Sequence, residues 1–204
     1  MSDPRGLPYV WGATDAERAT RYQCDHLLPQ AQHEFYRAID VDAPPAITYR
    51  WLQQLRIAPY SYDWVDNFAL PSPSRLTARA ERIATGQRMM HVFSVVDFEL
   101  GHSLPLGPRS RIATALLGTL YGTYIVTARG DGGSRLFVKV NANYPRSWYG
   151  WLVGGIMPWI DFVMMREQLR RLKGFAEASA RVTPPRPPST NCGDTIDRQH
   201  RTHV

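Results

Sequence analysis

The C-terminal third of the chain contains one long helix-forming stretch, residues 151–180, whose first half is strongly apolar. Residues 148–165 (WYGWLVGGIMPWIDFVMM) contain a single charged side chain, that of Asp161. A window of this length and apolarity would suggest a membrane span. A glycine pair, Pro158 and Asp161 oppose a span, because they weaken the helix and place a charge within the apolar stretch. We therefore expect a helix that is kinked at Pro158 and is buried or docks on a surface.

The second half of this stretch has the amphipathic pattern of a helix that lies on a sheet. Apolar residues recur at spacings of three and four, and basic residues occupy the positions between them. The apolar stripe consists of Phe162, Met165, Leu169, Leu172 and Ala176. We expect this stripe to cover the concave face of a sheet.

Residues 120–144 predict an antiparallel hairpin. Two segments, residues 120–129 and 134–144, are rich in β-branched and aromatic side chains, and they are joined by GDGG at residues 130–133. Glycines in such a turn permit positive φ, which a tight hairpin requires. The turn is not a phosphate-binding loop, because no helix that begins with Lys and Ser or Thr follows it.

Further elements are expected earlier in the chain. Residues 35–41 and 89–100 predict strands, and residues 102–106 predict a short strand that pairs back. Residues 46–55 predict a helix, and residues 57–68 predict a second short helix or an aromatic loop.

Alternation along these strands predicts which side chains face inward. On the last strand the inward set is apolar and consists of Leu136, Val138, Val140 and Ala142. The opposite set is polar and should face water: Arg135, Lys139, Asn141 and Asn143. On the preceding strand the choice stays open between the set containing Tyr124 and Val126 and the set containing Tyr121, Thr123 and Ile125.

The order of these elements resembles that of a known superfamily. The carriers of the resemblance are IDVDAP at residues 39–44, PYSYDWVDN at 59–67, VDFE at 96–99, the hairpin, and PWIDFVMMREQL at 158–169. Across residues 33–178 the chain resembles the START-like helix-grip superfamily, which contains polyketide cyclases, lipid-transfer domains and pollen-allergen-type ligand binders. The resemblance implies an α+β helix-grip fold, with a curved antiparallel sheet wrapped around a long C-terminal helix and two short helices after the first strand. It implies no single catalytic motif, because a shared fold does not fix the chemistry.

Composition sets the expected domain organisation and surroundings of the protein. We expect an N-terminal extension at residues 1–30, one domain at 31–180 and a disordered Pro-rich tail at 181–204. Most of the net charge of +6 comes from the tail and the end of the long helix, so nucleic-acid binding is not expected. The two cysteines form neither a disulfide framework nor a zinc motif, which favours a cytoplasmic location.

Candidate acid–base groups are few. Asp97 and Glu99 lie on one face of a predicted strand, but the opposite set, which includes Val96 and Phe98, is more apolar and should face the interior. Asp161 fits either a buried acid or a carboxylate at a helix start after Pro158. We favour the helix start, because free backbone N–H groups there stabilise a carboxylate. The six histidines are dispersed, so no metal and no cofactor are expected.

The predicted function is therefore the binding or transport of an apolar small molecule, a lipid or a polyketide-like aromatic, between the sheet and the closing helix. The residues expected to contact this ligand are Tyr62, Trp64, Asp66, Val96, Phe98, Tyr124, Val126, Val138, Val140, Phe162, Met165 and Leu169. One alternative is a polyketide cyclase or dehydratase that uses a pocket acid or tyrosine. Another is a non-catalytic interaction protein with a filled core, with peripheral membrane contact left open. The oligomeric state is not predicted.

Overall fold

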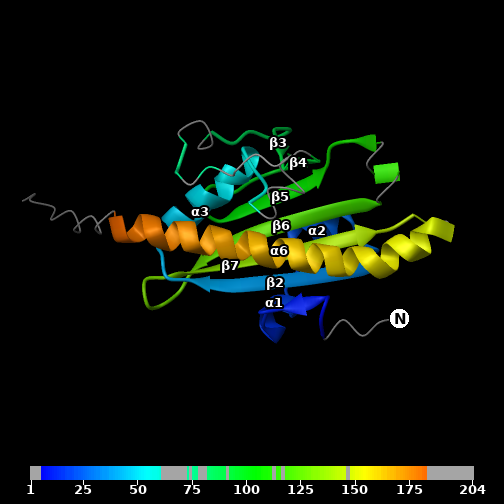
Figure 1. The fold of residues 1–204 in the computed structure, drawn as a ribbon, viewed down its shortest axis with the longest axis horizontal. Coiled ribbons are helices and arrows are strands. Elements are labelled where there is room, and N and C mark those ends of the chain that lie inside the picture. The colour runs from blue at the N-terminus through cyan, green and yellow to red at the C-terminus, as the bar shows by residue number, and fades with distance from the viewer. Residues whose placement is uncertain are drawn as a thin grey trace, which may run out of the picture.

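A curved sheet wrapped around one long helix forms the body of the protein. The computed structural model describes residues 6–60, 73, 75–77, 82–90, 92–111, 114–115, 118–145 and 148–182, the first six of the last range as backbone only. The strands are β1 (Val10–Trp11), β2 (His33–Val41), β3 (Arg88–Met89), β4 (Phe93–Val95), β5 (Ser103–Pro108), β6 (Thr119–Ala128) and β7 (Ser134–Asn143). The helices are α1 (Asp15–Ala19), α2 (Gln23–Leu27), α3 (Pro45–Gln53), the 3-10 helix η1 (Gln54–Arg56) and α6 (Trp148–Val182). Figure 1 shows α6 crossing the face of the sheet.

The seven strands lie in the order β1-β2-β7-β6-β5-β4-β3. Neighbouring strands are antiparallel except β1 and β2, which are parallel. The predicted hairpin is confirmed: β6 and β7 pair along their full length, with Tyr124 opposite Val138 and Val126 opposite Leu136. The sheet, the short helical segment after β2 and the long closing helix together make this a helix-grip fold.

Helix α6 continues through Pro158 and covers the concave face of the sheet. Leu169, Leu172 and Ala176 are buried against the core, as the amphipathic stripe predicted. Near its C-terminal end α6 also packs on α3, where the Trp51 ring stacks on the Phe175 ring at a centroid distance of 4.8 Å. Within the described residues, no helix combines the length and the apolarity that crossing a membrane requires.

The strand predicted at residues 89–100 is wrong in two respects. The chain turns back at Met90, whose φ is +45°, so that β3 and β4 form a hairpin. Val95 has the same parity as Asp97 and Glu99, which were expected to face water, yet its side chain enters the core. Val96 lies on the outer face, because a Cβ added at Gly107 would meet both Tyr121 and Val96. Continuous alternation did not reveal the turn, because no glycine marks it.

The convex face of the sheet is covered by the N-terminal segment. Val10, Ala13 and Tyr22 pack against an outer cluster formed by Tyr36, Ala38 and Phe137. The expectation that Lys139 and Asn141 face water is therefore wrong. Lys139 is 4% exposed and Asn141 is 1% exposed, and both bind Asp25, at 2.6 Å and 2.9 Å. Alternation identified the outer face correctly but not the segment that covers it.

Candidate ligand-binding site

A buried ion pair lies between β2 and the N-terminal half of α6. Arg37 points from the concave face of β2, and its Nη2 donates to Asp161 Oδ2 at 2.9 Å. The Arg37 side chain is fully buried and that of Asp161 is 19% exposed. Arg37 also donates to the backbone carbonyl of Tyr9 at 2.6 Å, and its guanidinium lies 5.5 Å from the ring centroids of both Phe35 and Phe162. The pair is thus a charged centre enclosed by aromatic rings.

Burial dominates the electrostatics of this centre. It raises the pKa of Asp161, and the Arg37 guanidinium offsets the rise only in part. Burial also raises the pKa of Tyr144 and of Tyr124, and in both cases the nearby Asp161 carboxylate raises it further. Both tyrosines are therefore neutral hydroxyl donors at physiological pH. Asp161 thus lies close enough to influence two buried hydroxyl groups.

A second polar centre joins β6 to α6. Tyr124 Oη donates to Gln168 Oε1 at 2.7 Å, and Gln168 Nε2 donates to the Pro59 carbonyl at 2.6 Å. The sulfur of Met165 lies 3.6 Å from the Tyr124 hydroxyl, and that of Met90 lies 4.0 Å away. Both polar side chains are almost fully buried. A hydroxyl and an amide are therefore held in place within an otherwise apolar, methionine-lined environment.

Apolar side chains on the inner side of α6 are less deeply buried in its N-terminal half than in its C-terminal half. Met157 and Met165 are only partly buried, whereas Leu169 and Leu172 are fully buried. On β6, Gly122 leaves no side chain between Leu120 and Tyr124, and a Cβ added there would touch Val140 at an ordinary 3.6 Å. Gly122 therefore keeps the concave face next to Val140 free of a side chain.

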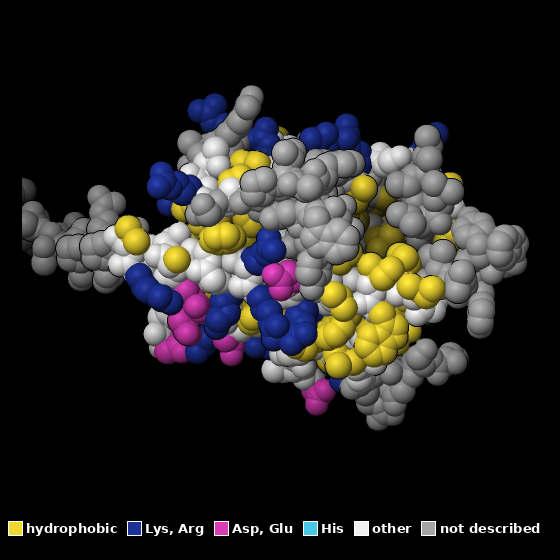
Figure 2. Space-filling model, viewed as in Figure 1, with side chains coloured by type: hydrophobic (Ala, Val, Ile, Leu, Met, Phe, Trp, Pro, Cys, Tyr) yellow, Lys and Arg dark blue, Asp and Glu magenta, His cyan; other side chains and the backbone are white. Residues whose placement is uncertain are grey.

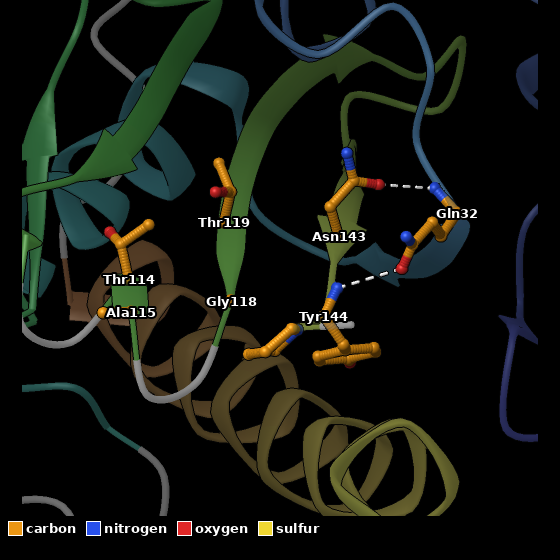
Figure 3. A pocket seen from close by; sticks show the side chains of 8 residues that line it. Gln32, Thr114, Ala115, Gly118, Thr119, Asn143 and Tyr144 are labelled. Carbon is orange, nitrogen blue, oxygen red and sulfur yellow. Dashed lines mark hydrogen bonds between the residues drawn. The ribbon is translucent and has the colours of Figure 1, made fainter. Parts of the chain in front are cut away.

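A pocket of about 420 Å³ opens at the end of the sheet near the start of α6. Its lining is Gln32, Thr114, Ala115, Gly118, Thr119, Asn143, Tyr144 and Pro145. Figure 3 shows Gln32 tied to the end of β7: its backbone N–H donates to Asn143 Oδ1 at 2.6 Å, and its Oε1 accepts from the Tyr144 N–H at 3.1 Å. The lining is mainly polar, and Tyr144 also packs in the core. The pocket therefore suits a polar group better than an apolar one.

Among the described residues that were predicted to contact the ligand, none lines this pocket. Tyr124, Val126, Val138 and Leu169 lie in the core cluster beneath α6, together with the partly buried Met165. Val140 and Phe162 are also buried, and Phe98 packs at the edge of the core. Val96 lies on the outer face of the sheet, away from the interior. Tyr62, Trp64 and Asp66 lie outside the described residues.

The preferred interpretation of Asp161 is corrected. It lies in the middle of α6 rather than at a helix start, and its partner is a buried arginine rather than backbone N–H groups. Sequence reasoning did not single out Arg37, Tyr144 or Gln168. A signal for Arg37 was present, because it shares the inward parity of Phe35 and a buried charge requires a partner of opposite sign.

The other candidate acids do not contribute to this site. Asp97 and Glu99 are exposed, as expected, and Asp97 Oδ2 accepts a hydrogen bond from Gln23 on the outer surface. Across the described ranges, no group of three or more His, Cys, Asp or Glu side chains is placed to hold a metal ion. Cys24 lies on α2 and is buried against the sheet, where its backbone N–H donates to Thr123 Oγ1 at 3.0 Å, and burial raises the pKa of its thiol to about 11.

The chain was compared with family models, curated proteins and solved structures, and only the solved structures gave matches. No protein-family model matches the chain, and no curated protein matches it. A solution structure of a Thermobifida fusca protein is 14% identical with a TM-score of 0.48, over 73% of this chain and 94% of that one. The di-domain ARO/CYC StfQ from the steffimycin biosynthetic pathway is 13% identical with a TM-score of 0.46, over 72% and 51% of the two chains. Ara h 8.0201 is 12% identical with a TM-score of 0.40, over 72% and 98%.

Proposed function

We propose that the protein binds a small, mainly apolar molecule between the sheet and the part of α6 that runs from Met157 to Gln168. The observation that supports this most directly is the apolar interior with two fixed polar centres, Arg37–Asp161 and Tyr124–Gln168. Ligand sites typically combine apolar walls with a few polar groups that set orientation. Burial of ligand surface would supply the affinity, at about 25 cal/mol per Å². The proposed ligand class is a lipid or a polyketide-like aromatic, bound in a cytoplasmic protein.

The polar centres also suggest what the ligand carries. Within the described part of the chain, Arg37 Nε is buried without a hydrogen-bond partner. Tyr124 donates its proton to Gln168 and keeps lone pairs that can accept. A buried donor without an acceptor is costly. The ligand is therefore proposed to carry at least one hydrogen-bond acceptor, such as a carbonyl or a carboxylate.

Binding fits the geometry better than acid–base catalysis does. A carboxyl with a raised pKa near two tyrosines is the type of group that catalysis uses. Asp161, however, is held by Arg37, and the Tyr124 proton is directed to Gln168. Either group would have to break its present bond before it could move a proton to or from a substrate. We therefore propose cyclisation or dehydration only as the second candidate.

Native mass spectrometry of the purified full chain tests the proposal. We expect an added mass of an apolar molecule that organic solvent removes. After extraction, a fluorescent long-chain fatty acid should bind saturably.

A blocking variant provides the control. Gly122→Leu places a side chain on the concave face beside Val140 and should abolish probe binding. Ala128→Leu adds the same side chain at the exposed end of the same strand and should bind normally. Circular dichroism would establish that both variants fold. Absence of any bound molecule together with no saturable probe binding in the wild type would refute the proposal.

A further inference from the structure

The outer face of α6 carries an exposed apolar stripe. Ile156, Trp159, Ile160 and Val163 are 47%, 52%, 40% and 45% exposed. Their spacing of three and four residues places them on one side of the helix, opposite the buried residues Phe162 and Leu169. Figure 2 shows the resulting apolar patch over the N-terminal half of α6. Scattered exposed apolar residues are normal, but four on two successive turns form a patch that requires explanation.

Basic side chains follow the stripe on the same helix. Arg166 and Arg170 occupy the next two turns; Arg170 is exposed and Arg166 is half-buried. Val163 and Arg170 are about 10 Å apart along the axis, at 1.5 Å per residue. The acid on this face, Glu167, is bound by Arg171 at 2.9 Å. Figure 2 shows Lys and Arg side chains adjoining the apolar patch. The face therefore combines apolar and cationic character.

From this face we infer that the protein docks on an anionic lipid surface, with Ile156, Trp159, Ile160 and Val163 inserted at the interface. Tryptophan favours the boundary between water and acyl chains, and arginine favours anionic headgroups. A helix with these two features lies along a membrane rather than across it. The inference does not depend on the interior ligand, because the stripe is on the opposite side of α6.

Self-association fits the stripe less well. The four side chains expose an area on the order of a few hundred Å². Each partner of a standard protein interface buries about 800 Å². Parallel pairing would also bring Arg166 against its own copy. A lipid surface has no such area requirement, because each inserted side chain contributes separately.

Vesicle flotation with the full chain tests the inference. Two vesicle types are used: phosphatidylcholine alone, and phosphatidylcholine with about a quarter phosphatidylglycerol. We expect binding to the anionic vesicles that weakens as salt is raised. Trp159→Ser and, separately, Ile160→Ser should each weaken binding about tenfold. Arg170→Gln should weaken binding to the anionic vesicles about fivefold.

Two matched variants complete the test. Leu100→Ser removes an apolar side chain that is 68% exposed but lies outside α6, and should bind as the wild type does. Gly122→Leu, which blocks the interior, should also bind vesicles normally, so failure of the ligand proposal is separable from failure here. Absence of vesicle binding by the wild type, or wild-type binding by both Trp159→Ser and Ile160→Ser, would overturn the inference. So would a dimer in sedimentation that either substitution dissociates.

Discussion

Arg37→Met is expected to lower the free energy of unfolding by about 3–5 kcal/mol. The substitution fills much of the same volume but leaves the Asp161 carboxylate beneath α6 without its cation. A buried charge that loses its partner costs far more than the pair contributes when intact. Urea denaturation followed by circular dichroism would measure the loss.

The pH dependence of this loss identifies its cause. Because burial raises the pKa of Asp161, the stability from its protonated form is present at acidic pH and is lost as pH rises through the folded-state pKa. Without Arg37 that pKa rises further, so Arg37→Met should be less destabilising at mildly acidic than at mildly alkaline pH. The double variant Arg37→Met/Asp161→Leu should recover most of the loss. A loss independent of pH and unchanged in the double variant would point to packing alone.

A surface pair serves as the comparison. Arg129 binds the exposed carboxylate of Asp42 at 3.3 Å and also pairs with Asp131 in the hairpin turn. Arg129→Met should cost less than about 1 kcal/mol, because water already solvates these charges. Comparing the stability losses of Arg129→Met and Arg37→Met separates the effect of removing an exposed cation from the effect of removing a buried one.

The elements that the sequence predicted best are those with strong local signals. The β6–β7 hairpin combines alternation with a glycine-rich turn, and α6 combines length with a stripe. Strand β2 (His33–Val41) was also recognisable, since alternation predicted a strand over residues 35–41. By contrast, α1 and α2 are five residues each, too short for a period of 3.6 to repeat twice. Their position is set by tertiary contacts, which local patterns do not carry.

The candidate site was predictable only in its apolar part. Inward residues such as Val138 and Leu169 follow from periodicity alone. The polar centres depend on pairs that are far apart in the sequence: Arg37 with Asp161, and Tyr124 with Gln168. One sequence supplies no covariation to connect them. Asp161 is the lone acid in the apolar part of α6, which is compatible with a buried charge. Interpreting it as a carboxylate at a helix start predicted backbone N–H partners and not an arginine on β2.

The N-terminal segment that covers the convex face contains a largely buried carboxylate, that of Asp25, whose loss should strongly destabilise the protein. Asp25→Ala is expected to lower the free energy of unfolding by about 3–5 kcal/mol. Its carboxylate accepts from Lys139 Nζ at 2.6 Å, from Asn141 Nδ2 at 2.9 Å and from the Tyr22 backbone N–H at 2.8 Å. Lys139 would retain the Glu34 carboxylate at 3.6 Å and the Tyr36 ring, whose centroid lies 5.1 Å from its Nζ. Hydrogen exchange should report faster opening of the N-terminal segment.

The matched control and the sign of the pH effect make this prediction specific. Asp15→Ala lies in the same segment, but its side chain is 97% exposed, and it should cost less than about 1 kcal/mol. Burial alone would raise the pKa of Asp25, but Lys139, the Tyr22 N–H and Asn141 together lower it. The stability that Asp25 supplies is therefore present above the ordinary Asp pKa of 3.8 and is lost as pH falls through its lower folded-state value. The difference in free energy of unfolding between wild type and Asp25→Ala should become smaller as the pH is lowered. If that difference grows instead, Lys139 is not held by this carboxylate.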